Sequence, residues 1–125
     1  MITKHLTASG LMIGDWVSCD GKCYQIAEIG GMVCLDAENE LFASLEDIEP
    51  IPLAPEILER NGFASYNNSS FQLRENGMYI SWRNVGRLNL SFGCAPTNDL
   101  HIKCKYVHQL QHALQLCGID KEIIL

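Results

Sequence analysis

The sequence has no apolar run that approaches the roughly 18 residues a membrane-spanning helix needs. Its first sixteen residues carry one lysine and no apolar segment of signal-peptide length. Positive charge is scarce up to residue 59, where Lys4 and Lys22 stand against eleven acidic residues. These absences argue against a membrane partner and predict a cytoplasmic location.

Motifs for catalysis and phosphate binding are also missing. The chain has no Gly-rich phosphate loop, no nucleophile elbow and no Ser, His and Asp order that would place a triad together. The acidic residues do not follow the order of a calcium loop. We therefore expect no enzyme activity and no cofactor.

Six cysteines are present, an even number that invites a disulfide interpretation. A cytoplasmic setting disfavours disulfides, and 125 residues can bury enough surface to fold without them, so we expect free thiols. Cys19 and Cys23 flank a turn as C-x3-C, but no second pair completes a zinc site. Hairpin neighbours can reach disulfide distance, which leaves their oxidation after purification open.

Residues 11–53 have the pattern of a small, tightly turned β-meander. Short apolar runs alternate with turn residues, among them Asp20-Gly21, whose two residues suit the positive φ angles of a two-residue hairpin turn. Five short strands at this spacing usually curl into a barrel, and the pattern resembles an SH3-like barrel. Trp16 and Tyr24 could fill its core or line a groove for a proline-rich peptide, and the core is favoured.

The remainder of the chain predicts an α+β arrangement. Residues 1–10 are expected to be a flexible N-terminus, and residues 54–70 a helical linker and loop. In residues 71–125, apolar and polar residues alternate along segments 78–83 and 87–92, which predicts an antiparallel sheet with one apolar face. The apolar stripe of a helix over about 105–116 predicts its cover.

Two opposite charge clusters are candidate binding surfaces. Residues 60–105 carry a net charge of +4, and Arg74, Tyr79, Arg83 and Arg87 could share the polar face of the second sheet. Arginine beside an aromatic residue on a strand can bind phosphate or stack on bases, although a solvated face needs no ligand. The acidic candidates for a partner-facing surface are Asp36, Glu38, Glu40, Glu46 and Asp47.

His108 and His112 are four residues apart on the last expected helix, with His101 and Cys104 nearby in sequence. Two imidazoles at this spacing could face one metal ion. The pair lacks the glutamate of the HExxH pattern, and both rings are expected on the exposed, polar side of the helix. We therefore expect no metal, and a metal ion held by His108 and His112 is the alternative.

Three segments carry a family resemblance: LMIGDWV at 11–17, EDIEPIPLAPEILERNGF at 46–63 and KYVHQLQ at 105–111. They resemble a group of small uncharacterised proteins of gut anaerobes, often encoded among prophage or mobile-element genes. Asp15 and Ala54 stand where that group usually has Asn and Thr. The resemblance spans most of residues 11–116, implies a bacterial or phage origin and transfers no site residues.

These observations favour a non-enzymatic protein-interaction module with a basic partner, encoded by a prophage or mobile element. The alternative is a nucleic-acid accessory protein that binds through the Arg-rich sheet face. Metal-dependent catalysis through His108 and His112 is a third hypothesis.

Overall fold

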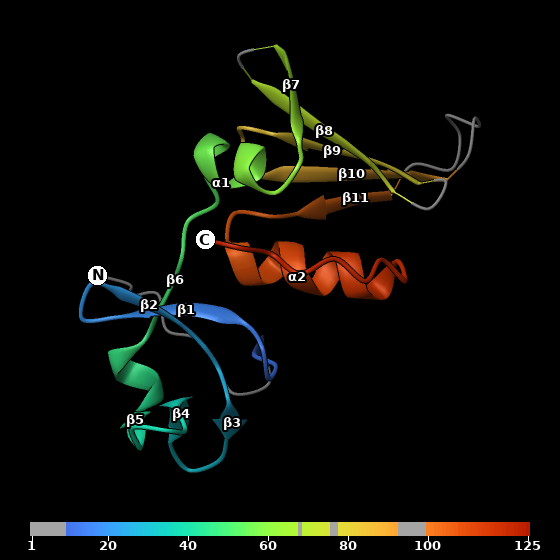
Figure 1. Cartoon of the computed structure of the whole chain (residues 1–125). Helices are drawn as coiled ribbons and strands as arrows, with labels where there is room; N and C mark the ends of the chain where they lie inside the picture. The colour runs from blue at the N-terminus through green and yellow to red at the C-terminus, as the bar shows by residue number, and fades with distance from the viewer. Residues whose placement is uncertain (1–9, 68, 76–77, 93–99) are drawn as a thin grey trace. The chain divides into compact units, whose positions relative to one another are not determined.

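A computed structural model describes residues 10–67, 69–75, 78–92 and 100–125 (Figure 1). The chain divides into two compact units, Met1–Ile51 and Pro52–Leu125. Antiparallel strands make up most of the regular structure, together with two α-helices. The α+β class is therefore confirmed.

The first unit contains two three-stranded sheets, ordered β2-β1-β6 and β3-β4-β5. A 3₁₀ turn, Leu45–Asp47, precedes the last strand of this unit. The strands are β1 (Trp16–Cys19), β2 (Lys22–Gln25), β3 (Glu28–Ile29), β4 (Val33–Asp36), β5 (Leu41–Ala43) and β6 (Glu49–Pro50).

The segment between β2 and β3 joins the two sheets. The Ile26 backbone N–H donates to the Asp15 carbonyl at 2.9 Å, and the Ala27 N–H donates to the Cys34 carbonyl at 2.8 Å. Each bond continues the ladder of a different sheet. Two sheets thus stand where we predicted an SH3-like barrel, and closure of that barrel stays a prediction.

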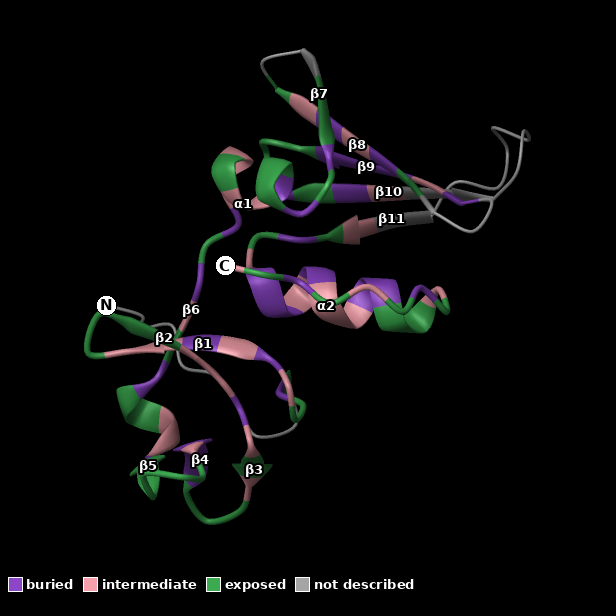
Figure 2. Ribbon diagram, in the orientation of Figure 1, coloured by how far each residue is buried: buried purple, intermediate pink, exposed green. Residues whose placement is uncertain are grey.

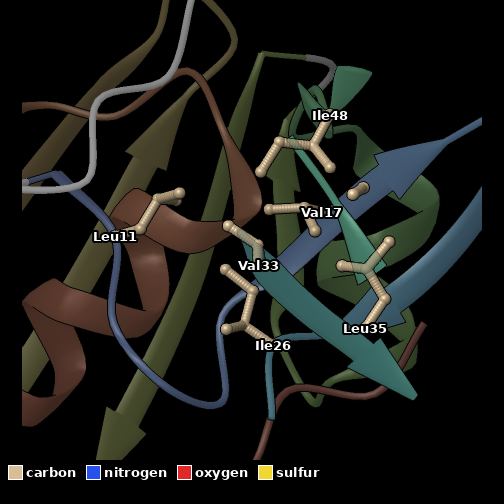
Figure 3. Packing of buried hydrophobic residues seen from close by; sticks show 7 residues of the cluster. Leu11, Val17, Ile26, Val33, Leu35 and Ile48 are labelled. Carbon is tan, nitrogen blue, oxygen red and sulfur yellow. The ribbon is translucent and has the colours of Figure 1, made fainter. Parts of the chain in front are cut away.

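One hydrophobic core serves both sheets of this unit (Figure 3). Tyr24 is half-buried and packs against this core. This agrees better with the predicted core position of the ring than with a position in an open groove. At the first turn, Asp20 and Gly21 have φ angles of 50° and 79°, which confirms the predicted positive-φ hairpin. The core members are Leu11, Val17, Ile26, Val33, Leu35, Ala43 and Ile48.

The second unit is a five-stranded antiparallel sheet ordered β11-β10-β9-β8-β7, with helix α2 running alongside it (Figure 1). Apolar side chains of α2 are buried, which agrees with the predicted stripe. The elements are α1 (Pro55–Arg60), β7 (Ala64–Asn67), β8 (Ser70–Glu75), β9 (Met78–Arg83), β10 (Arg87–Phe92), β11 (Leu100–Lys103) and α2 (Val107–Leu116).

Strand alternation divides this sheet into an apolar and a polar face, as predicted. Met78, Ile80 and Trp82 of β9 are buried, whereas Arg83 is exposed and Tyr79 is half-buried. Figure 2 shows the strands of this sheet coloured by burial. The Trp82 indole N–H donates to the Cys104 carbonyl at 2.7 Å. A buried indole without an acceptor would be costly, so this bond fixes the chain just after β11 beneath β9.

Strand β7 corrects the prediction for residues 54–70, which placed a loop at its position. Ala64 pairs with Gln72 and Ser65 with Phe71, and the register shifts before Asn67 pairs with Ser70. An edge strand bonds to one neighbour only, so polar and exposed residues can form it without an apolar alternation. The sequence pattern therefore gave no sign of it.

Asn61 connects the end of α1 to the C-terminal segment. Its side-chain amide donates to the carbonyls of Ile57 and Ile124, both at 2.7 Å. Its side-chain oxygen accepts the Ile124 backbone N–H, also at 2.7 Å. The buried side chain of Asn61 therefore hydrogen-bonds the backbone of Ile124, which lies 63 residues later in the sequence.

Replacing Asn61 with alanine removes three hydrogen bonds and leaves the backbone groups of Ile57 and Ile124 without these partners. We expect the free energy of unfolding to fall by about 2–3 kcal/mol. Urea denaturation followed by circular dichroism measures this change. Asn84→Ala, at an exposed turn position, is the matched control and should change the stability by less than about 0.5 kcal/mol. Equal stability of the two variants would contradict the role given to Asn61.

Candidate functional site

The polar face of the five-stranded sheet brings together the basic residues that the sequence singled out. Arg83 in β9 pairs directly with Arg87 in β10, and Arg87 pairs with Lys103 in β11. All three side chains are exposed. We call Arg83, Arg87 and Lys103 the cationic row, because they lie side by side across three neighbouring strands.

A second row of side chains lies on the same face, two residues away from the cationic row along β9 and β10. Gln72, Ser81 and Asn89 are register partners across β8, β9 and β10. Gln72 and Asn89 are half-buried, and Ser81 is 9% exposed. The Ser70 and Ser81 hydroxyl oxygens lie 3.4 Å apart. We call Gln72, Ser81 and Asn89 the polar row, and it offers amide and hydroxyl groups in the middle of the face.

Arg74 and Tyr79 form the third row of this face. They are register partners on β8 and β9, and the Arg74 guanidinium carbon lies 5.4 Å from the centre of the Tyr79 ring. This cation–π contact holds a planar cation against an aromatic ring. The four predicted residues therefore share one face as two pairs, Arg74 with Tyr79 and Arg83 with Arg87.

The charge on this face is of one sign. By register, no Asp or Glu lies on the polar face of the described strands β8 to β11. Like charges directly opposite one another on neighbouring strands destabilise a sheet. The cationic row therefore costs folding free energy in the free protein, and a bound anion would relieve that cost.

Sequence reasoning missed Lys103 and the polar row. The alternation in Leu100–Lys103 already placed His101 and Lys103 on one side of that strand, which was the available signal. The side chain of His101 lies outside the described residues. Which strand β11 pairs with, and in what register, required the structure.

The acidic candidates lie in the first unit, at two separate turns. Asp36, Glu38 and Glu40 surround the β4–β5 connection, whereas Glu46 and Asp47 belong to the 3₁₀ turn. All except half-buried Asp36 are exposed. The Asp47 carboxylate accepts the Ser44 hydroxyl at 2.9 Å. The structure therefore gives part of this negative charge a role in the turns.

Asp36 has a defined structural role in the β4–β5 turn. Its carboxylate accepts the Asn39 side-chain N–H at 2.7 Å, the Asn39 backbone N–H at 3.3 Å and the Glu38 N–H at 3.1 Å. These bonds, the Asn39 side chain first, hold the pKa of the carboxyl below its usual value. The Asp36 carboxylate therefore stabilises the β4–β5 turn, and this role accounts for its presence without a ligand.

The two histidines of α2 are less exposed than predicted. His108 is 6% exposed instead of lying on an exposed polar side, and His112 is half-buried. The His108 ring stacks on Tyr106 with centroids 6.0 Å apart, and it meets His112 edge-on at 5.7 Å. Among the described residues, no group of three or more His, Cys, Asp or Glu side chains is placed to hold a metal ion.

Five cysteines lie in the described part of the chain, and all five are free thiols. Cys19 pairs with Lys22, and Cys23 pairs with Ser18, so neighbouring positions put the two thiols on opposite faces of the hairpin. That register corrects the idea that they could oxidise to a disulfide. Burial raises the pKa of Cys104 to about 12, which keeps this thiol protonated and unreactive. Cys94 lies outside the described residues.

Comparison with protein-family models, with curated proteins and with solved structures finds no match to this chain. None of the helices in the described residues is long and apolar enough to cross a membrane.

The turn role of Asp36 predicts a specific pH dependence. A carboxyl whose pKa is lowered by folding stabilises the protein above its unfolded pKa of about 3.9, and this contribution is lost as the pH falls through the folded value. The Asp36→Asn variant should therefore melt below the wild type at pH 6, and the difference in melting temperature should close as the pH falls below about 3.9. Thermal denaturation at several pH values measures it. Glu46→Gln, which removes one carboxylate from the 3₁₀ turn, is the control, and an identical profile for the two variants would contradict the prediction.

Proposed function

We propose that this chain is a non-enzymatic, nucleic-acid-binding accessory module whose ligand binds on the polar face of the five-stranded sheet. The observation that carries the proposal is the cationic row. Three exposed cations lie in register on neighbouring strands, and no acidic residue shares the described face. The phosphates of a nucleic acid are the natural counter-charges for such a row.

The side-chain chemistry of the row supports a phosphate ligand. A guanidinium presents donors in a planar fork that matches two phosphate oxygens, and Arg83 and Arg87 provide two such groups side by side. Lys103 adds a third positive charge at the neighbouring strand. Because the free protein bears the repulsion within the row, part of the binding free energy comes from its removal.

The net charge of −6 does not argue against such a site. Residues 60–105 carry a net charge of +4, and most of the negative charge lies before residue 60. Exposed charges separated by more than about 8 Å are largely screened at physiological ionic strength. A local positive face can therefore bind an anion on a chain that is acidic overall.

The proposal extends to the first unit and to the genetic setting. We take the first unit to be an SH3-like barrel, supported by the ladder that passes between its sheets and by the 3₁₀ turn before β6. The resemblance of the segments at 11–17, 46–63 and 105–111 supports a prophage or mobile-element origin. An accessory protein of such an element would act next to nucleic acid.

Fluorescence anisotropy with labelled oligonucleotides tests the proposal. Binding should weaken as salt rises from about 50 to 200 mM, with a log–log slope of roughly −2 for single strands, because three cations displace counterions. Changing all three cations, R83Q with R87Q and K103Q, should abolish binding. Arg60→Gln, which removes an exposed charge in α1, should leave it unchanged.

Two outcomes would refute the assignment. One is the absence of binding to any oligonucleotide at low salt. The other is equal binding by the triple variant and the wild type. The single change Arg87→Gln supplies a folding control, since relief of repulsion should leave the free protein as stable as the wild type or slightly more stable at low salt.

A second candidate function, binding of a basic protein, is favoured by a specific surface of the first unit. Beside Glu38 and Glu40 at the β4–β5 turn, Phe42 is 50% exposed and Leu41 is also exposed. Aromatic anchors next to charges of one sign are common at protein interfaces. We call Glu38, Glu40 and Phe42 the acidic hairpin surface.

Pull-down with immobilised protein tests this second candidate. A basic host or phage protein should be retained at low salt and released at high salt, because surface charge attraction is screened. The double change F42S with E40K should abolish retention, whereas E59K in α1 should not. Empty pull-downs at low salt, or unchanged retention by the F42S/E40K variant, would exclude the acidic hairpin surface.

A further inference from the structure

The width of the polar face limits which form of nucleic acid it can contact through the bases. Five strands about 4.8 Å apart span roughly 19 Å, whereas the major groove of a duplex is about 12 Å wide and admits a helix or a two-stranded ribbon. Base edges in a duplex lie about 8.5 Å deep in that groove. Side chains in the middle of a broad sheet face cannot reach them.

The middle of this face nevertheless carries groups suited to base edges. Gln72 and Asn89 have both donors and acceptors in their amides, and Ser81 contributes a hydroxyl. These groups lie low on the face, since Ser81 is buried and its two neighbours are half-buried. Phosphates that rest on long, exposed arginines would not touch them, whereas an unpaired base lying flat on the sheet would.

The spacing of the three rows fits nucleotides that lie along the strands. Successive rows are two residues apart, which is about 6.7 Å, so the Arg74–Tyr79 pair lies roughly 13 Å from the cationic row. Phosphates bound by the cationic row would let their bases extend over the polar row towards Tyr79. The aromatic ring and the guanidinium of the pair both offer planar surfaces for base stacking.

From these three observations we infer that the ligand is an unpaired nucleic-acid strand. Its phosphates lie on Arg83, Arg87 and Lys103, its base edges meet the polar row, and one base stacks on the Arg74–Tyr79 pair. The inference rests on the proposed nucleic-acid function and deepens it by naming the strand form and the stacking residues.

The test compares a single-stranded oligonucleotide of about 12 nucleotides with a duplex of the same sequence, at one salt concentration. The single strand should bind the wild-type protein at least about tenfold more tightly. Tyr79→Leu should weaken single-strand binding by about tenfold, because a lost base–aromatic stack costs roughly that much. Its salt slope should not change, since no phosphate contact is lost. Tyr79→Trp should bind as tightly as the wild type or more tightly.

Controls separate this inference from the proposed function. Melting temperatures within a few degrees of the wild type show that the Tyr79 variants fold, and Tyr79→Trp keeps an aromatic ring if Tyr79→Leu does not fold. Equal or tighter binding of the duplex, together with no effect of the Tyr79 changes, would overturn the single-strand inference and leave the cationic row intact. If the wild-type protein bound no oligonucleotide at all, both the single-strand inference and the proposed function would be overturned.

Discussion

The pairing register of strands β8 to β11 is the constraint from which the functional surface follows. Because side chains alternate along each strand, the register that buries Ile80, Trp82 and Leu88 also places Arg83 opposite Arg87. A shift by one residue would bury the arginines and expose the core. The apolar face therefore fixes the position of the cations, even though their mutual repulsion opposes that arrangement.

Beneath the sheet, one buried hydrogen bond ties this register to the rest of the second unit. The Trp82 indole contacts the carbonyl of Cys104, and the Leu53 N–H donates to the Lys105 carbonyl in the next residue at 2.8 Å. The segment between β11 and α2 is thus held from two sides. Such anchoring keeps β11, and with it Lys103, in place at the edge of the sheet.

The first unit uses polar residues differently. Asp20 and Gly21 supply a turn through their positive φ angles, and Asp36 closes another through three hydrogen bonds. A cluster that appears in the sequence as a block of negative charge is therefore partly structural. Glu38 and Glu40, beside the exposed Phe42, remain as the part of it that a partner could contact.

Local sequence signals determined the strands 78–83 and 87–92, the Asp20-Gly21 turn and the apolar stripe of α2, because each depends on residues close together in the chain. They did not determine the edge strand β7, whose segment shows no apolar alternation, or the burial of His108, which depends on the packing of α2 in the folded unit. The same holds for the candidate site. Alternation placed Arg74, Tyr79, Arg83 and Arg87 on one side of their strands, but only strand pairing made Lys103 the third member of a row, because register is a long-range property.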